Sequence, residues 1–198
     1  MTARVGPGSV RDIGVSAWAF SRIAGRVTGT GPPAIFTTLG RTRGLFWGWL
    51  HFAGRLMPFG RLTRREAELV ILTVAHLSEC DYEWQHHVQL GRRAGVRDID
   101  LAAIREGSIH EAWTEREQVM IDTVRLLHRD GDLDDPAWTR LHRALGDREA
   151  IELLLLAGHY GMLATVLTVL RVPPDPAQAT SRPTPKVARL TASRAAPR

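Results

Sequence analysis

Side chains able to do chemistry are concentrated in one segment, residues 68–87, which reads ELVILTVAHLSECDYEWQHH. The segment holds the only cysteine of the chain, Cys80, and three of its eight histidines, His76, His86 and His87. An imidazole exchanges protons near neutral pH, and a thiolate is a strong nucleophile. These residue types could therefore support general acid/base chemistry or thiol chemistry.

Helical spacing relates several of these side chains. If a helix begins at Asp81, then Cys80 stands at its entrance. Glu83 follows Cys80 by three residues, and His87 follows Glu83 by four. Residues three and four apart share one face of a helix, so we expect these three side chains to lie together. Glu68 precedes Cys80 by twelve residues, within an apolar run that predicts a buried helix. A lone buried carboxylate is costly, and a histidine partner would explain it.

These four positions also fit a family pattern. The AhpD-like proteins have a glutamate, eleven residues, Cys-x-x-Cys, three residues and a histidine, and this spacing matches Glu68, Cys80, Glu83 and His87, with glutamate in place of the second cysteine. The chain resembles the carboxymuconolactone decarboxylase branch of that family over about residues 40–172. The resemblance implies an all-α, oligomeric subunit of about six to eight helices.

The missing second cysteine separates this chain from the family's peroxidases. Those enzymes use paired cysteines, one attacking the peroxide and the other resolving the sulfenic acid. With one cysteine, a dithiol cycle within one subunit is excluded, whereas a one-cysteine cycle with an outside thiol stays open. The decarboxylases of the family use neither a metal nor an organic cofactor, and they have the glutamate and histidine that match Glu68 and His87. We therefore expect no cofactor.

The resemblance suggests a role for each position. His87 would be the general acid/base, and Glu68 would orient it or pass it a proton. Cys80 would have its thiolate favoured by the helix N-terminus, although neighbouring acids oppose this. Glu83 could be a second acid/base group, and Tyr82 could donate a hydrogen bond to an enolate. His86 and His76 are weaker candidates.

Structural roles would explain the same residues without chemistry. A lone cysteine in a helical protein commonly packs as a small hydrophobe, and Glu68 could form a structural ion pair. The step from Glu83 to His86 has the E-x-x-H spacing of di-iron bundles, but the chain has no second such step. We therefore expect no metal site.

The elements that position this segment are predicted to be helices throughout, because no stretch alternates with a period of two. Two Thr-x-x-Glu capping boxes, at Thr63 and Thr114, predict helix starts, and Gly146 predicts a stop before a last helix that runs to Val172. The expected helices begin and end near Pro32 and Leu39, Leu45 and Leu56, Thr63 and Ala75, Asp81 and Gly95, Asp98 and Gly107, Thr114 and Gly131, Asp135 and Gly146, and Asp147 and Val172.

Composition predicts one domain with two less ordered ends. The chain has 198 residues, of which 44% are hydrophobic and 24% charged. We expect a loose arm over 1–30, a domain over 31–172 and a disordered, proline-rich tail over 173–198. The formal charge of +5 is carried by the two ends, which argues against a nucleic-acid-binding module. The apolar run 151–172 contains charged and polar residues, so we expect a core helix and no membrane contact.

Three functions remain open at this level. The first is a cofactor-independent enzyme that moves protons at carbon in a small organic acid or lactone. The second is a one-cysteine peroxidase acting through Cys80, and the third is a non-catalytic oligomer that binds a small ligand. A single cysteine excludes an intrachain disulfide and is typical of the reducing cytoplasm, where we expect the protein to act. A homo-oligomer, trimeric or hexameric by resemblance, is expected.

Overall fold

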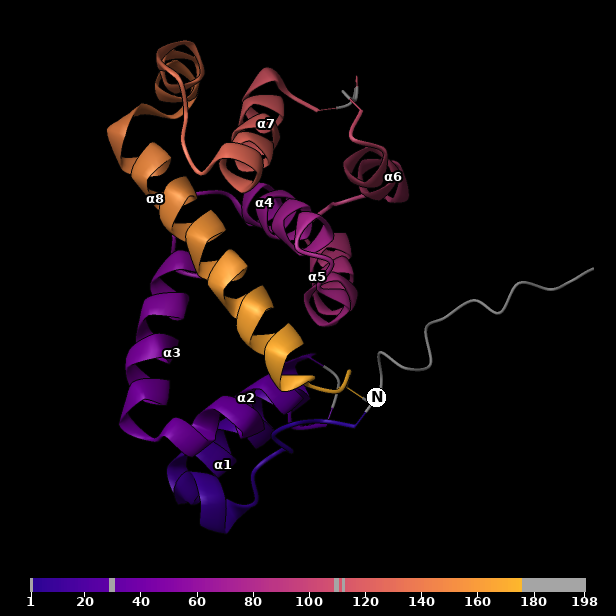
Figure 1. The fold of residues 1–198 in the computed structure, drawn as a ribbon, viewed down its shortest axis with the longest axis vertical. Coiled ribbons are helices and arrows are strands. Elements are labelled where there is room, and N and C mark those ends of the chain that lie inside the picture. Colours follow the sequence, from indigo (N-terminus) through magenta and orange to yellow (C-terminus); the bar gives the residue numbers. More distant parts are fainter. Residues whose placement is uncertain (1, 29–30, 109–110, 112, 176–198) are drawn as a thin grey trace, which may run out of the picture.

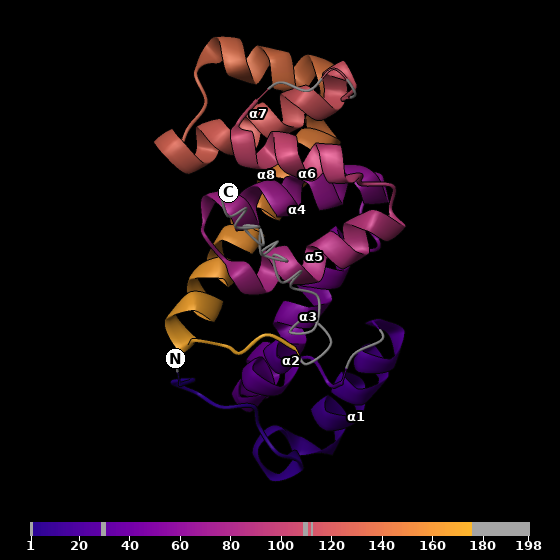
Figure 2. The same cartoon turned by 90° about the vertical axis from the view of Figure 1, so that its right-hand side faces the viewer.

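Eight α-helices make up the fold in the computed structural model, which describes residues 2–28, 31–108, 111 and 113–175. The described residues contain no strand, so the predicted all-α class is confirmed. The helices are α1 (Val10–Thr28), α2 (Ala34–Leu39), α3 (Gly44–Leu56), α4 (Arg64–Leu77), α5 (Asp81–Arg93), α6 (Asp98–Glu106), α7 (Glu115–Asp130) and α8 (Asp135–Leu170), with a 3₁₀ turn at Gly40–Thr42. Figures 1 and 2 show α1 to α3 gathered at one end of the molecule, α4 to α7 at the other, and α8 running along both.

Helix α4 is the centre of the core. All of its residues from Glu66 to Ala75 are buried, and α5, α7 and α8 pack against it. A helix that is apolar nearly all round is stable only when neighbours cover every face. This burial brings Glu68 into the interior, where its carboxylate needs a partner.

Reciprocal ion pairs fix α4 against α7. Both helices begin with the predicted capping boxes, and the glutamate of each box also binds an arginine of the other helix. Arg116 Nε lies 2.6 Å from Glu66 Oε1, and Arg65 Nε lies 2.7 Å from Glu117 Oε1. Because each carboxylate both caps its own helix and holds the neighbouring one, the N-termini of α4 and α7 are fixed relative to each other.

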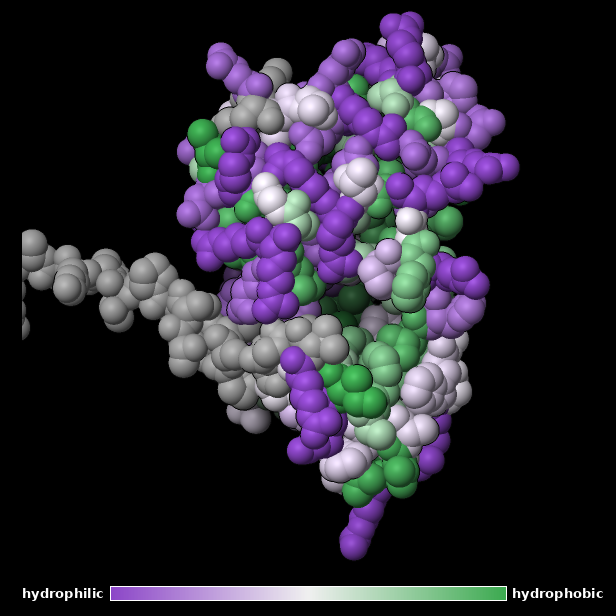
Figure 3. All heavy atoms as spheres, turned by 180° about the vertical axis from the view of Figure 1, so that it is seen from behind, coloured by the Kyte–Doolittle hydropathy of each residue, from purple (hydrophilic) through white to green (hydrophobic). Residues whose placement is uncertain are grey.

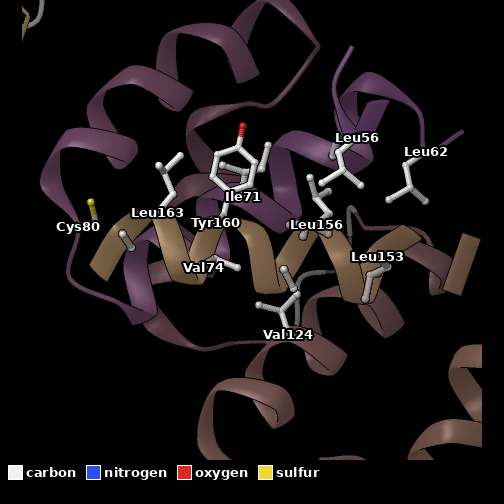
Figure 4. Packing of buried hydrophobic residues seen from close by; sticks show 14 of the residues in the cluster. Leu56, Leu62, Ile71, Val74, Cys80, Val124, Leu153, Leu156, Tyr160 and Leu163 are labelled. Carbon is white, nitrogen blue, oxygen red and sulfur yellow. The ribbon is translucent and has the colours of Figure 1, made fainter. Parts of the chain in front are cut away.

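Helix α8 is interrupted where the sequence predicts a stop. Gly146 has φ 70° and ψ 177°, a conformation that favours glycine, and the chain continues as a second helical segment. By length and composition alone α8 could cross a membrane, but its buried face forms much of the main core. Figure 4 shows Leu153, Leu156, Tyr160 and Leu163 on this face, directed towards the other helices.

Both predicted ends differ from expectation. The loose arm predicted over 1–30 instead contains α1, because Ile13 and Ala17 bury themselves against Phe46 of α3. The chain is also ordered beyond 172, since the side chain of Asp175 is buried against α2 and α5. The prediction for residues 176–198 lies outside the described part of the chain.

Candidate active site

An apolar cavity of about 750 Å³ lies where α1, α2 and α3 meet α5 and α8. Figure 3 shows a hollow at mid-height on this face, beside the apolar surface of the α1-to-α3 end. Aromatic rings supply much of the wall, and the side chains that can exchange protons or carry charge are few. These few are Arg64, Tyr82, Glu83, His86, His87, His159 and Tyr160.

A buried hydrogen bond joins His87 to Glu68, as the sequence predicted for the lone carboxylate. His87 Nδ1 lies 2.8 Å from Glu68 Oε2, and Arg64 lies 3.1 Å from Glu68 Oε1. A carboxylate can only accept a hydrogen bond, so in this pair Nδ1 of His87 carries the proton and donates it to Glu68. The other ring nitrogen, Nε2, is left for chemistry in the cavity.

Glu83 lies one helical turn before His87 and lines the same cavity. Glu83 is only 2% exposed, and neither of its carboxyl oxygens has a hydrogen-bond partner among the described residues. Burial raises the pKa of Glu83 to about 8, because the charged form has lost its water. At neutral pH this carboxyl is therefore mostly protonated and can donate a proton.

The remaining histidines have different surroundings. Burial lowers the pKa of His86 to about 3, with His87 and Arg64 adding to the effect, and its ring stacks on Tyr82. His76 does not line this cavity but lies on another, beside Trp84. Of these two weaker candidates, the structure brings only His86 to the cavity.

Cys80 does not line the cavity that holds Glu83 and His87. Cys80 is 3% exposed and belongs to the main hydrophobic core, part of which is drawn in Figure 4. Together with His76, it borders a second cavity of about 580 Å³. Burial raises the pKa of the Cys80 thiol to about 11. Cys80 is the N-cap of α5, with φ −89° and ψ 89°, and its thiol lies near the backbone of Glu83, but it does not join Glu83 and His87 in their cavity.

Tyr82 is engaged elsewhere in the structure. Its hydroxyl donates to Asp175 Oδ2 at 3.0 Å and accepts from the backbone N–H of Ile35 at 3.3 Å. Asp175 Oδ1 also accepts from the backbone N–H of Ala34 at 2.8 Å. The expectation that Tyr82 donates to an enolate is therefore corrected, because its proton is already used to hold the C-terminal segment against α2.

His159 is the cavity residue that the sequence reasoning left out of the site. It lies on α8, its residue is 5% exposed, and burial lowers its pKa to about 4. The signal was its position within a long apolar run, where a histidine needs either a partner or a function. Within the described part of the chain, no three His, Cys, Asp or Glu residues are grouped so that they could hold a metal ion.

Comparison with known proteins agrees with the helical fold. Residues 43–121 match the carboxymuconolactone decarboxylase family, and no curated protein matches the chain significantly. An uncharacterized peroxidase-related protein from Ralstonia eutropha JMP134 has the same fold, with a TM-score of 0.75 at 14% identity over 88% of this chain and 94% of that one. A peroxidase-related protein from Silicibacter sp. TM1040 gives 0.73 at 15% identity over 83% and 87%. A variant of the debrominase Bmp8 in complex with 2,3,4-tribromopyrrole gives 0.73 at 16% identity over 90% and 95%.

Proposed function

We propose that this chain, which belongs to the carboxymuconolactone decarboxylase family through residues 43–121, is a cofactor-independent enzyme that transfers protons at carbon. One observation carries the proposal. Glu83 and His87 lie one turn apart on α5, line one apolar cavity, and differ in what they can do there. His87 offers the free nitrogen of a ring oriented by Glu68, whereas Glu83 offers an acidic proton at neutral pH.

The chemistry follows from these two groups. Nε2 of His87 removes a proton from a carbon next to a carbonyl, and the electron pair of the C–H bond moves into an enolate. The Glu83 carboxyl donates its proton to the enolate oxygen or to a second carbon. Transfer of the proton from His87 to Glu83, directly or through solvent, then restores both groups. The substrate class is a small carbonyl compound such as a lactone.

Glu68 and Arg64 act behind the imidazole. When His87 becomes an imidazolium, its new charge lies 2.8 Å from the Glu68 carboxylate. This stabilises the charged intermediate state, and the ion pair with Arg64 at 3.1 Å holds the carboxylate in position beforehand. Glu68 is thus a positioning residue, while His87 and Glu83 touch the substrate.

The test uses a lactone carbon acid and does not require the natural substrate. α-Angelica lactone is incubated with the protein in buffered D₂O, and proton NMR follows deuterium uptake and migration of its double bond. We expect acceleration by the wild type and a loss of roughly 100-fold or more in His87→Gln, the typical size of general acid/base catalysis. His142→Gln, at an exposed histidine of α8, is the matched control. No acceleration by the wild type, or full activity of His87→Gln, contradicts the proposal.

The one-cysteine peroxidase is supported less well. Two neighbours in fold are called peroxidase-related, but a likeness at 14–15% identity concerns the fold alone. Burial of Cys80 and the raised pKa of its thiol both oppose a reactive thiolate. A non-catalytic binding protein would use the same cavity, and the deuterium experiment separates it from an enzyme.

We also propose that the protein is a cytoplasmic homo-oligomer. Four large apolar side chains are exposed on the part of α8 that follows Gly146, namely Ile151, Leu155, Met162 and Val169. Their spacing places them within roughly 40° of one another around the helix, so they form a continuous stripe that a second subunit could cover. Sedimentation at micromolar concentration should show a species larger than the 22.0 kDa chain, and a monomer alone would contradict this proposal.

A further inference from the structure

We propose that the ligand of the apolar cavity is an uncharged ring compound with a polar atom at each end, and that His159 binds the end remote from Glu83. The inference rests on the proposed function, since it names the substrate class of the same site. The supporting observation is that several residues of the cavity wall have buried polar atoms without a hydrogen-bond partner among the described residues. Its consequence is a preference for neutral lactones, ketones or phenols over carboxylic acids.

The unpartnered atoms belong to three wall residues. Among the described residues, no group bonds to Nδ1 of His159, to Nε1 of Trp49 or to the two carboxyl oxygens of Glu83. A buried polar atom without a partner costs about 1–3 kcal/mol, and native proteins contain few of them. Several such atoms around one cavity of ligand size are explained if a bound molecule supplies the missing hydrogen bonds.

Ring contacts separate the two polar ends of the cavity. The Tyr160 ring lies against His87, with centroids 5.1 Å apart, and also against His159, with centroids 5.2 Å apart. The Tyr160 ring therefore contacts both of these histidines of the wall. A ligand that reaches both ends must present an apolar body to the Tyr160 ring and the other aromatic wall residues between them.

The orientation of His159 is fixed by packing. Its ring stacks on Trp49, with centroids 6.1 Å apart and an interplanar angle of 28°, and the edge of Phe52 lies against it at 5.4 Å. A ring held on two sides by aromatic neighbours loses little further freedom when it binds a ligand. This makes His159 a specificity-determining residue, not a flexible surface histidine.

The charge of the wall excludes an anionic ligand. At neutral pH burial keeps His86 and His159 uncharged and Glu83 mostly protonated. Burial also raises the pKa of the two wall tyrosines, so their hydroxyls stay neutral. The charge of Arg64 is already opposed by Glu68 at 3.1 Å. A carboxylate entering this cavity would lose its water without gaining an unpaired cation.

Three probes of the same size test both parts of the inference by equilibrium dialysis at pH 7. These are 2-naphthol, which is uncharged, 2-naphthoate, which is anionic, and naphthalene, which has no polar atom. For the wild type we expect 2-naphthol to bind about 10-fold more tightly than 2-naphthoate. His159→Leu should weaken 2-naphthol about 10-fold and leave naphthalene within about 2-fold, because only the hydrogen bond is lost.

Two further variants make the result specific. His159→Asn keeps a polar atom near the position of Nδ1 and should restore most of the affinity for 2-naphthol. His142→Leu removes an exposed histidine of the same helix and should change nothing. Equal or tighter binding of 2-naphthoate overturns the inference, as does an equal effect of His159→Leu on 2-naphthol and naphthalene. The failure of all three probes to bind overturns it as well.

The measurement is independent of catalysis. Equilibrium dialysis detects the binding of 2-naphthol whether or not the protein exchanges carbon-bound protons. Loss of turnover with intact 2-naphthol selectivity would therefore leave this inference standing. Turnover with no selectivity would leave the proposed function standing and remove the inference.

Discussion

The carboxyl of Glu83 and the imidazole of His87 line the same cavity from consecutive turns of α5, without a hydrogen bond between them. Had they bonded to each other, the proton of Glu83 would have had an acceptor and its pKa would reflect the pair. Because they do not, burial alone raises the pKa of Glu83 to about 8. An acid and a base thus remain available to a substrate that lies between them.

Activity should depend on pH through Glu83. Its acidic form predominates below about pH 8 and is lost above it, so kcat/KM for proton transfer should fall as pH rises through about 8. Glu83→Gln cannot donate an acidic proton and should lower kcat by roughly 100-fold. The pH profile of this variant should also lack the alkaline fall, and retention of that fall would assign it to another group.

The same carboxyl should make stability depend on pH. The pKa of Glu83 rises from its ordinary value of 4.5 to about 8 on folding, so between these values the folded state binds more protons than the unfolded state. The free energy of unfolding should therefore decrease as pH rises from about 4.5 to 8. Glu83→Gln should remove this contribution, making the variant more stable than the wild type at pH 9 by on the order of 1–3 kcal/mol.

Urea unfolding at pH 5, 7 and 9 measures that difference. The gain of Glu83→Gln over the wild type should grow with pH and should be smallest at pH 5. Glu115→Gln, at an exposed position in the first turn of α7, is a control in which the difference should not grow in this way. A difference that is the same at all three pH values would mean that Glu83 is ionised in the folded protein.

Replacement of the only cysteine should leave proton transfer intact. Cys80 packs in the core and does not line the cavity of Glu83 and His87, so Cys80→Ala should keep kcat/KM within about 2-fold while costing about 1 kcal/mol of stability. A thiol-specific disulfide reagent should react with native Cys80 at least roughly 100-fold more slowly than with the urea-unfolded chain. Fast reaction in the native state would revive the peroxidase hypothesis.

Asp175 should stabilise the end of the fold that holds the cavity. In Asp175→Ala, the backbone N–H of Ala34 and the hydroxyl of Tyr82 both lose the carboxylate that accepts their hydrogen bonds. The expected cost is about 1–3 kcal/mol in urea unfolding. Asp147→Ala, an exposed aspartate paired only with His142 at the surface, should cost less than about 0.5 kcal/mol. Equal losses would show that the buried contacts of Asp175 contribute little.

The helical fold could be predicted because its signals are local. Each capping box, at Thr63 and at Thr114, spans only four residues and predicts where a helix begins. The single residue Gly146 predicts the break in α8. The partner of Glu68 was predictable as well, since a carboxylate inside an apolar helix requires one. Helical spacing alone predicted that Glu83 and His87 lie on the same face of α5.

The remaining features depend on contacts distant in sequence. Cys80 stands at the entrance of α5 as predicted, but its burial in the main core, away from the cavity, depends on α8 and other distant segments. The order of α1 rests on Phe46, and the burial of Asp175 rests on Ala34 and Tyr82, none of which a local pattern reveals. His159 meets Trp49 only through tertiary packing.

The cavity wall combines the first helix with the last, since Phe20 of α1 and Leu163 of α8 both line it. During translation, the aromatic residues of α1 to α3 are therefore synthesised well before α8, which covers them in the folded protein. During synthesis these side chains stay exposed, and nascent chains with uncovered apolar surface are prone to aggregate or to recruit chaperones. A stop codon placed before α8 would yield not a smaller enzyme but a chain that lacks His159, Tyr160 and Leu163 of the cavity wall and much of its core.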